Sequence, residues 1–413
     1  MKSKEPSDGP EIYAINRGRS GWTLSRRSLL SAAAAAAAAI PKRAQGASCA
    51  AGAVAHTDSL WSDAISQDGR LLATGSDDRT IKLWSLPDGA LLKTLTGHSD
   101  TVYSVALSPD LRVLASGSYD GIKLWSLPDG TLLNTLTGHS GWVYSLAITP
   151  DGRMLASGSL DKTIKLWSLP DGALLNTLTG HSDSVRSVAI SPDGRLLASG
   201  SWDNTIKLWS LPDGALLKTL TGHSDSLESV AISPDVRVLA SGSMDKTIKL
   251  WSLPDGALLN TLTGHSSYVD SVAISPDGRL LASGSGDHTI RLWSLPDGAP
   301  LNILTGHSEA VRALAISPDG RFLASVSGDK TIKLWSLPDG NLLPVCLMDP
   351  AASPSSVSGI TYTDDGVTYT LPCGSPIPSG AVCTCNCVSS AAGGGGGGGG
   401  VCTCIPVTYY YPN

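Results

Sequence analysis

The stretch TIKLWSLPDG, residues 163–172, recurs with small changes in seven consecutive units of a chain of 413 residues. Its tryptophan is, in order along the chain, Trp84, Trp125, Trp167, Trp209, Trp251, Trp293 and Trp335. These positions are 41 residues apart once and 42 residues apart five times. A period of this length, made of short strand-like runs and turn residues, is typical of repeat proteins whose units cannot bury their apolar faces alone. The sequence therefore predicts one closed array of seven units.

The fourth unit illustrates how a single repeat is built. Its runs of alternating or continuous apolar residues predict four strands, over 184–191, 196–199, 205–209 and 215–220. Turn residues separate these runs at 192–194 (PDG), 202–204 (WDN) and 211–214 (LPDG). Proline presets φ in such turns and glycine accepts a positive φ. Four antiparallel strands within 42 residues predict one blade of a β-propeller.

The units resemble WD repeats, with Gly180-His181 near the start of the fourth unit and Trp209 near its end. The resemblance covers about residues 54–348 and implies an all-β, seven-bladed propeller of four-stranded antiparallel blades. In that family, hydrogen bonds link the Trp indole through a Ser or Thr to the His and on to an Asp. The matching structural residues are Trp167, Ser157, His139 and Asp161 in the third unit, and Trp209, Ser199, His181 and Asp203 in the fourth. The second unit is one residue shorter between Asp120 and Trp125, which leaves its tetrad open.

The charge distribution argues against nucleic acid as a partner. The formal net charge is -6, but the first 46 residues hold eight Lys and Arg and only three acids. The remainder has 22 basic and 33 acidic residues, and an acidic body of this kind repels a phosphate backbone. We expect a monomer that binds protein or peptide rather than nucleic acid.

The first 48 residues resemble an export leader. The run SRRSLL at 25–30, followed by an alanine-rich stretch to Ile40, is similar to a twin-arginine signal. The apolar stretch of about 12 residues is shorter than the roughly 20 residues that span a bilayer. We therefore expect a periplasmic or extracellular protein with no integral membrane segment after leader removal. The alternative is a disordered basic tail that ends in an alanine helix.

Residues 349–413 differ in composition from the repeats. Residues 360–371 predict a β-hairpin around Asp365-Gly366, and a run of eight glycines begins at Gly393. The cysteines of the two Cys-x-Cys clusters are Cys383, Cys385, Cys387, Cys402 and Cys404. In an exported protein, clustered cysteines favour disulfides, and a bond between Cys49 and Cys346 would join the two ends of the propeller. The rival interpretation is a thiolate site for zinc or copper(I), with the propeller as carrier of a metal-binding or covalently modified tail.

Two segments are candidates for the outer strand of the seventh blade, one at the end of the last unit and one before the first. Residues 341–347 match the fourth strand of a repeat and are expected to complete the seventh blade. Residues 48–55 are the alternative, because WD-repeat rings often close through an N-terminal segment. Pro344 would remove one hydrogen-bond donor from the strand, which an outermost strand tolerates.

The histidines give no sign of catalysis. Seven of the eight occupy the structural position of the repeat, and His288 lies in a turn. No phosphate-binding glycine loop, metal-spaced His pair or nucleophile elbow interrupts the units. The sequence predicts a protein without enzymatic activity and without a cofactor.

Three positions vary strongly among the seven units: the third and fifth residues after the histidine, and the residue before the turn aspartate. In the WD-repeat family these positions open onto the top face, around the central channel. All large aromatic residues of the propeller other than the structural tryptophans and Phe322 fall there, and four charged residues complete the set. The predicted partner-binding residues are Trp61, Tyr103, Tyr119, Trp142, Tyr144, Arg186, Trp202, Glu228, Tyr268, Asp270 and Arg312. Because Trp, Tyr and Arg are common interface anchors, we expect a binding surface for a protein or peptide; drift after duplication is the alternative.

Overall fold

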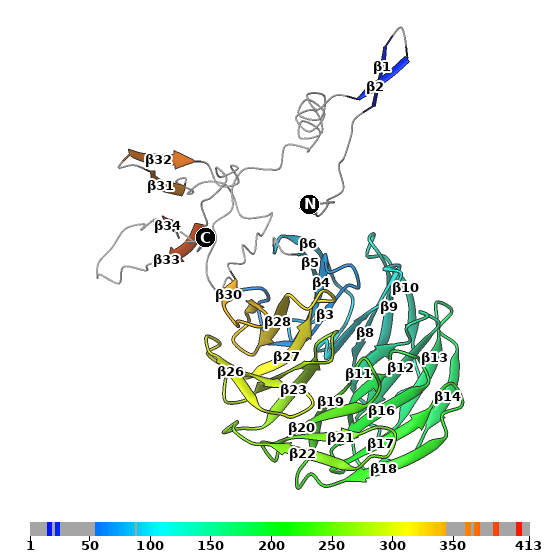
Figure 1. Cartoon of the computed structure of the whole chain (residues 1–413). Coiled ribbons are helices and arrows are strands. Elements are labelled where there is room, and N and C mark those ends of the chain that lie inside the picture. The colour runs from blue at the N-terminus through cyan, green and yellow to red at the C-terminus, as the bar shows by residue number, and fades with distance from the viewer. Residues whose placement is uncertain are drawn as a thin grey trace, which may run out of the picture. The chain divides into compact units, whose positions relative to one another are not determined.

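The computed structural model describes residues 54–86 and 89–343 with their side chains. Outside these ranges it describes only the backbone of six strands, β1 (Ile15–Gly18), β2 (Gly21–Leu24), β31 (Ile360–Asp364), β32 (Val367–Leu371), β33 (Cys383–Cys387) and β34 (Cys402–Pro406). Residues 54–343 form seven four-stranded antiparallel sheets, which confirms the predicted seven-bladed propeller (Figure 1).

The first three blades are built as follows. The first contains β3 (Leu60–Ile65), β4 (Leu71–Ser76), β5 (Ile81–Ser85) and β6 (Leu91–Leu95). The second contains β7 (Ser104–Leu107), β8 (Val113–Ser118), β9 (Gly121–Ser126) and β10 (Leu132–Leu136). The third contains β11 (Val143–Ile148), β12 (Met154–Ser159), β13 (Ile164–Ser168) and β14 (Leu174–Leu178).

The other four blades repeat this order. The fourth contains β15 (Val185–Ile190), β16 (Leu196–Ser201), β17 (Thr205–Ser210) and β18 (Leu216–Thr221). The fifth contains β19 (Leu227–Ile232), β20 (Val238–Ser243), β21 (Ile248–Ser252) and β22 (Leu258–Leu262). The sixth contains β23 (Val269–Ile274), β24 (Leu280–Ser285), β25 (Ile290–Ser294) and β26 (Pro300–Leu304). The seventh contains β27 (Val311–Ile316), β28 (Phe322–Ser327), β29 (Ile332–Ser336) and β30 (Leu342–Leu343).

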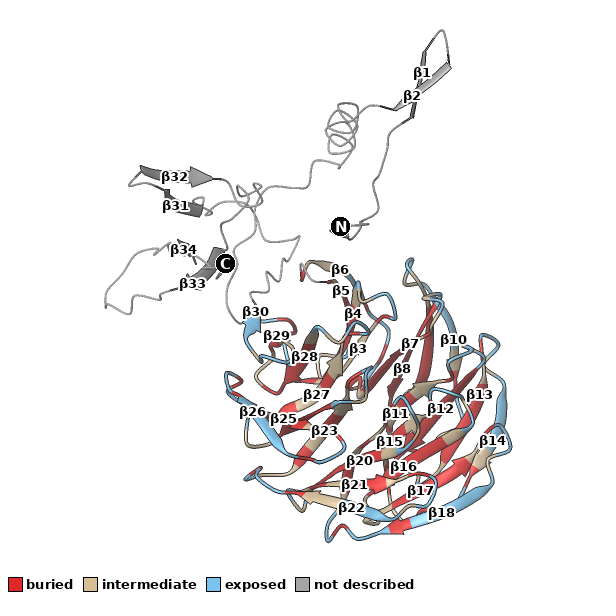
Figure 2. Cartoon of the chain, viewed as in Figure 1, coloured by how far each residue is buried: buried red, intermediate tan, exposed pale blue. Residues whose placement is uncertain are grey.

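The core lies between neighbouring blades. Trp209 of the fourth blade, for example, packs in one apolar cluster with Ile164 and Leu166 of the third. An equivalent cluster joins Leu60 of the first blade to Val326 of the seventh, so the ring is closed. Figure 2 shows the result, with the second and third strands of the blades mostly buried and the outer strands β10, β14, β18 and β26 mostly exposed.

Both ends of the propeller contribute to the outer edge of the seventh blade. β30 pairs with Leu334 and Trp335 of β29, but among the described residues it ends at Leu343, directly before Pro344. Val54 forms a bridge with Thr331 near the other end of β29. The expected strand over 341–347 is thus described for two residues only, and the N-terminal segment shares the closure of the ring.

The terminal segments contain short strands. β1 and β2 pair antiparallel within the leader, where Ile15, Trp22 and Thr23 are residues with high β-propensity. The alanine-rich stretch, for which a helix is the alternative interpretation, lies outside the described residues. In the tail, β31 and β32 pair antiparallel at the predicted hairpin. β33 and β34 pair antiparallel with Cys385 opposite Cys404, in a sheet of order β32-β31-β34-β33. The cysteine side chains lie outside the described residues, as does Cys49, so the expectations of disulfides or a metal site stay predictions.

Candidate functional site

Each blade is tied together by the hydrogen-bonded tetrad that the sequence analysis expected. In the third blade the Trp167 indole donates to Ser157 Oγ at 2.8 Å, and the two ring nitrogens of His139 lie 2.8 Å from Ser157 Oγ and from Asp161 Oδ2. The fourth blade repeats this arrangement with Trp209, Ser199, His181 and Asp203. The tetrads fix the loops of the top face, which we define as the face that carries these histidines and aspartates.

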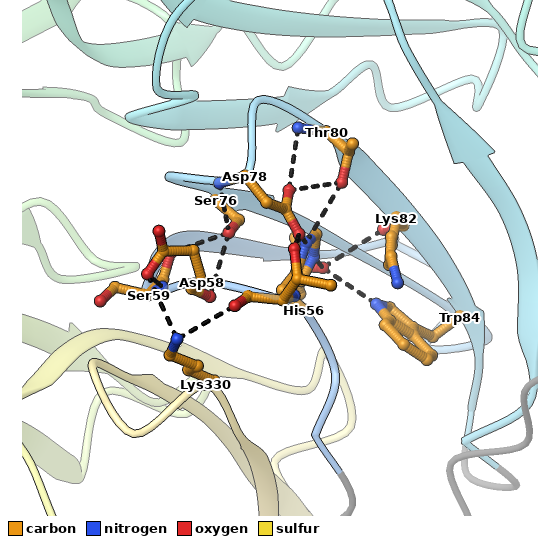
Figure 3. Close-up of polar contacts among 11 residues, drawn as sticks. His56, Asp58, Ser59, Ser76, Asp78, Thr80, Lys82, Trp84 and Lys330 are labelled. Carbon is orange, nitrogen blue, oxygen red and sulfur yellow. Dashed lines mark hydrogen bonds and ion pairs between the residues drawn. The ribbon is translucent and has the colours of Figure 1, made fainter.

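The first two blades depart from the repeat and still form the tetrad. In the first blade Thr74 replaces the serine, and it lies 2.8 Å from His56 Nε2 and 2.9 Å from the Trp84 indole nitrogen (Figure 3). In the second blade the shortened turn still brings Asp120 to 2.5 Å from His98. Lys123, 3.3 Å from Asp120, approaches the carboxylate that a threonine hydroxyl contacts in the other blades.

These tetrads hold their titratable groups in one charge state. Burial acts to raise the pKa of Asp161, but hydrogen bonds from His139 and Thr163 outweigh it and hold the pKa well below its usual range. Burial lowers the pKa of His56, although Asp78 opposes the shift. The aspartates are therefore ionised and the buried imidazole of His56 is neutral near pH 7. His288 is exposed in a turn, with φ 70°.

One side chain from each blade meets at the mouth of the central channel. We call this set the central ring; its members are Trp61, Tyr103, Tyr144, Arg186, Glu228, Asp270 and Arg312. They are the residues at the fifth position after the histidine in all seven units. Together they line a cavity of about 70 Å³. The first strands lie side by side around the channel, which is why a residue that recurs every 42 positions reaches its counterpart in the next blade.

Three of the seven residues of the central ring form an aromatic arc. The rings of Trp61 and Tyr103 have centroids 5.2 Å apart, and so do those of Tyr103 and Tyr144. The Trp61 indole donates to Asp77 Oδ1 at 2.7 Å. Aromatic side chains at these separations attract one another, so the arc is a packed unit rather than three independent side chains.

The other four residues are charged and pair with one another. Arg186 lies 4.1 Å from the centroid of Tyr144 and donates from Nε to Glu228 at 2.9 Å. Arg312 lies 3.2 Å from Asp270 and 4.5 Å from the centroid of Trp61. Burial raises the pKa of Asp270 to about 7, with Arg312 opposing the shift and Glu228 adding to it. Each basic side chain therefore joins an acid to an aromatic ring.

The remaining aromatic residues surround the central ring. Tyr119 is 58% exposed, and its ring centroid lies 5.5 Å from that of Trp142. Trp142 is half-buried and donates to Asp100 at 3.3 Å. We call Tyr119 and Trp142 the outer pair. Trp202, in contrast, donates to Glu228 of the central ring at 2.8 Å, and this hydrogen bond helps to hold the Glu228 carboxylate in place.

Small residues at the variable positions accommodate large neighbours. A Cβ on Gly286 would lie 2.5 Å from the Tyr268 ring, and one on Gly328 would lie 2.8 Å from the Glu309 carboxylate. Gly286 and Tyr268, which are both variable positions of the sixth unit, are therefore coupled on the top face. Sequence reasoning missed this coupling, and it also left Asp77 and Asp100 out of the predicted site, since turn aspartates are frequent throughout the repeats.

A larger cleft of about 520 Å³ lies at the opposite ends of the strands, between the sixth and seventh blades. Pro276 and Pro318 line it, and they belong to the turn that recurs in every unit. Among the residues with described side chains, no cluster of three or more His, Cys, Asp or Glu is arranged to hold a metal ion. The same part of the chain contains no helix long and apolar enough to span a bilayer.

Comparison with known families gives one result that covers most of the chain. The family model described as "WD domain, G-beta repeat" matches seven consecutive segments, residues 49–85, 89–126, 130–168, 172–210, 214–252, 256–294 and 298–336. A search of curated proteins found no match. Each matched segment contains one tetrad and the first three strands of one blade, and from the second segment on it begins with the outer strand of the preceding blade, as residues 172–210 do with β14.

Proposed function

Since the chain belongs to the WD40 repeat family, whose propellers are generally non-catalytic protein-interaction scaffolds, we propose that it binds a protein or peptide through its top face. The observation that carries this proposal is the outer pair beside the central ring. Tyr119 is the most exposed of the large aromatic side chains described, and its ring contacts that of Trp142, which stands two residues before Tyr144 of the central ring.

The anchors are held in place before any partner arrives. Hydrogen bonds to Asp77, Asp100 and Glu228 fix the indoles of Trp61, Trp142 and Trp202, respectively. A side chain that is already ordered loses little conformational entropy on binding, so more of its contact energy appears as affinity. Rigid Trp and Tyr anchors of this kind dominate many protein interfaces.

The size of the central cavity restricts how a partner binds. The cavity of about 70 Å³ is small beside the roughly 300–1,000 Å³ of typical ligand pockets. A partner segment therefore lies across the central ring rather than inserting a large side chain into it. Its apolar residue contacts the outer pair, and its polar groups face Arg186, Glu228, Asp270 and Arg312.

The test compares two double variants. Tyr119→Ala with Trp142→Ala removes the outer pair, whereas Leu175→Ala with Leu217→Ala removes two side chains that are as exposed as Tyr119 but lie on the outer strands. With any partner recovered from the native compartment and then purified, we expect the outer-pair variant to lose at least about tenfold in affinity and the outer-strand variant to bind normally. Equal binding by the wild type and the outer-pair variant would contradict the proposal.

Export forms a second part of the proposal. We propose that residues 1–48 direct the folded chain out of the cytoplasm by the twin-arginine route. Replacing Arg26 and Arg27 by lysine is expected to retain the protein in the cytoplasm, and normal export of that variant would exclude this route.

A tail-based function is the alternative. The antiparallel register that sets Cys385 opposite Cys404 and Cys387 opposite Cys402 supports either cross-strand disulfides or a shared thiolate site. Deleting residues 349–413 separates the two functions. Partner binding survives the deletion if the top face is responsible, whereas metal content or redox behaviour disappears if the tail is responsible.

A further inference from the structure

Six of the seven contacts between neighbouring blades share one polar link. A serine hydroxyl on the first strand of one blade accepts the N–H of a residue on the first strand of the next, as in Val188 N–H to Ser145 Oγ at 3.0 Å. The serines are Ser62, Ser104, Ser145, Ser187, Ser229 and Ser271. These bonds run around the channel in the same direction and connect the blades in sequence.

The contact between the seventh and first blades, which we call the seam, lacks this link. Ala313 stands where the other blades have the serine, so no hydroxyl is available to the next strand. The residue it would contact is Asp63, whose counterparts are Val105, Leu146, Val188, Val230, Val272 and Leu314. An acid thus replaces a valine or leucine at the one interface where the serine is also replaced.

A third substitution lies at the same interface. The second strand of each of the first six blades carries a glycine that lies close to the next blade. A Cβ atom added to Gly200, for example, would lie 3.1 Å from Val230 Cγ1. In the seventh blade this position is occupied by Val326, which is fully buried. The seam is therefore packed by a different set of side chains from its six sister interfaces.

Asp63 is half-buried as a residue, but little compensates the burial of one of its carboxylate oxygens. It stands in register with Thr74, on strands whose apolar residues pack against Val326 and Ile332 of the seventh blade. Its Oδ2 is buried and has no hydrogen-bond partner. Burial raises the pKa of Asp63 to about 8, and the one contact that opposes the shift is with its own backbone N–H.

The charged groups on the surrounding elements are engaged elsewhere or do not affect Asp63. Arg312 on β27 pairs with Asp270, and Lys82 on β5 lies over the Trp84 ring. Lys333 on β29 and His56, bonded to Thr74, are the other titratable groups at the seam. β4, β7 and β28 carry no charged residue. On the top face Lys330 lies 3.0 Å from Thr57 O and 3.5 Å from Asp58 (Figure 3), but both side chains of this ion pair are largely exposed.

We propose that the propeller opens at the seam. The seam is closed while the Asp63 carboxyl is protonated, and it loosens as this carboxyl ionises. The open seam exposes Asp63 to water, where its pKa returns toward the ordinary value of 3.8. The closed seam binds one proton more than the open seam between these two pKa values. The open population therefore rises about tenfold for each pH unit up to about pH 8 and then levels off.

The opening also reaches the candidate binding site. The seam passes between Arg312 and Trp61, which contact one another in the central ring. Separation of β27 from β3 breaks this contact, so the same protonation step links the closure of the ring to the integrity of its top face.

Hydrogen exchange of the full chain, followed by mass spectrometry between pH 6.5 and 8.5, tests the proposal. The peptide over 60–72 reports on the seam, and the peptide over 185–197 reports on a sister interface. After correction for the intrinsic base-catalysed rate, we expect protection of the first peptide to fall by at least about tenfold relative to the second over this range. An unchanged ratio would overturn the proposal.

Two variants connect the effect to Asp63. Asp63→Asn keeps the size and polarity of the side chain but does not titrate, so the pH dependence of the ratio disappears. The triple variant Asp63→Val, Ala313→Ser, Val326→Gly restores the residues of the sister interfaces and is expected to exchange like them at every pH. Persistence of the wild-type pH dependence in Asp63→Asn would show that another group is responsible.

Discussion

The guanidinium of Arg312, in the last blade, lies 4.5 Å from the ring centroid of Trp61, in the first. This contact joins the four charged residues of the central ring to its three aromatic residues across the seam. It depends on a pair of residues that are 251 positions apart in the chain. The ring of the propeller and the central ring of side chains are therefore completed at the same place.

Removal of Arg312 should destabilise the propeller through the acid it leaves behind. We expect Arg312→Ala to lower the free energy of unfolding by about 2 kcal/mol, below the usual cost of breaking a buried ion pair because Arg312 is partly exposed. Denaturant unfolding measures the change. The double variant Arg312→Ala, Asp270→Asn should recover part of the loss, and no recovery would mean that the pairing is not the cause.

The tetrads should be sensitive to the loss of one hydroxyl. Ser199→Ala leaves the Trp209 indole and His181 without their shared partner, at about 1–3 kcal/mol for each buried group left unsatisfied. Chemical unfolding is the measurement. Ser182→Ala is the matched control, because Ser182 is exposed and contacts Asp203 through its backbone only. Equal stability of the two variants would argue against an energetic role for the tetrad.

Coupling between variable positions predicts a steric effect at Gly286. The added methyl of Gly286→Ala would meet the Tyr268 ring at 2.5 Å, so we expect a loss of about 1–3 kcal/mol. The second substitution Tyr268→Ala should return the stability close to that of Tyr268→Ala alone. Additive losses in this double-mutant cycle would mean that the two positions do not interact.

Acid should unfold the protein progressively. The tetrad aspartates have depressed pKa values, to about 2 for Asp287, and such groups contribute stability above pH 3.8 that is lost as the pH falls through the folded value. Burial lowers the pKa of His98 and His265 from 6.5, so their contribution is present above pH 6.5 and falls below it. Asp63 and Asp270, whose pKa values burial raises, act in the opposite direction and stabilise the fold as the pH falls. Because the tetrads outnumber these two acids, the free energy of unfolding should still be lower at pH 3 than at pH 6.5. Thermal melts in this range check the sign, and a flat profile would contradict the charge states assigned to the tetrads.

The sequence predicted the blades closely because their hydrogen bonds are local. Strand pairing in the fourth blade spans fewer than 42 residues, and the predicted run 205–209 is found as Thr205–Ser210. The tetrad residues were predictable for the same reason, since the family motif places all four within one unit. The shortened second unit left its tetrad open because only the backbone path decides whether Asp120 reaches His98.

Residue identities alone therefore determined the fold, the spacing of the tetrads and the positions that vary between blades. The tertiary structure decided which of these varying residues meet, since radial packing brings together side chains from blades that are far apart in the chain. It also revealed the seam, where Ala313, Val326 and Asp63 look like isolated exceptions in the sequence and become neighbours only when the ring closes. The physical reason is that closure joins the two ends of the array, and no local repeat pattern specifies that contact.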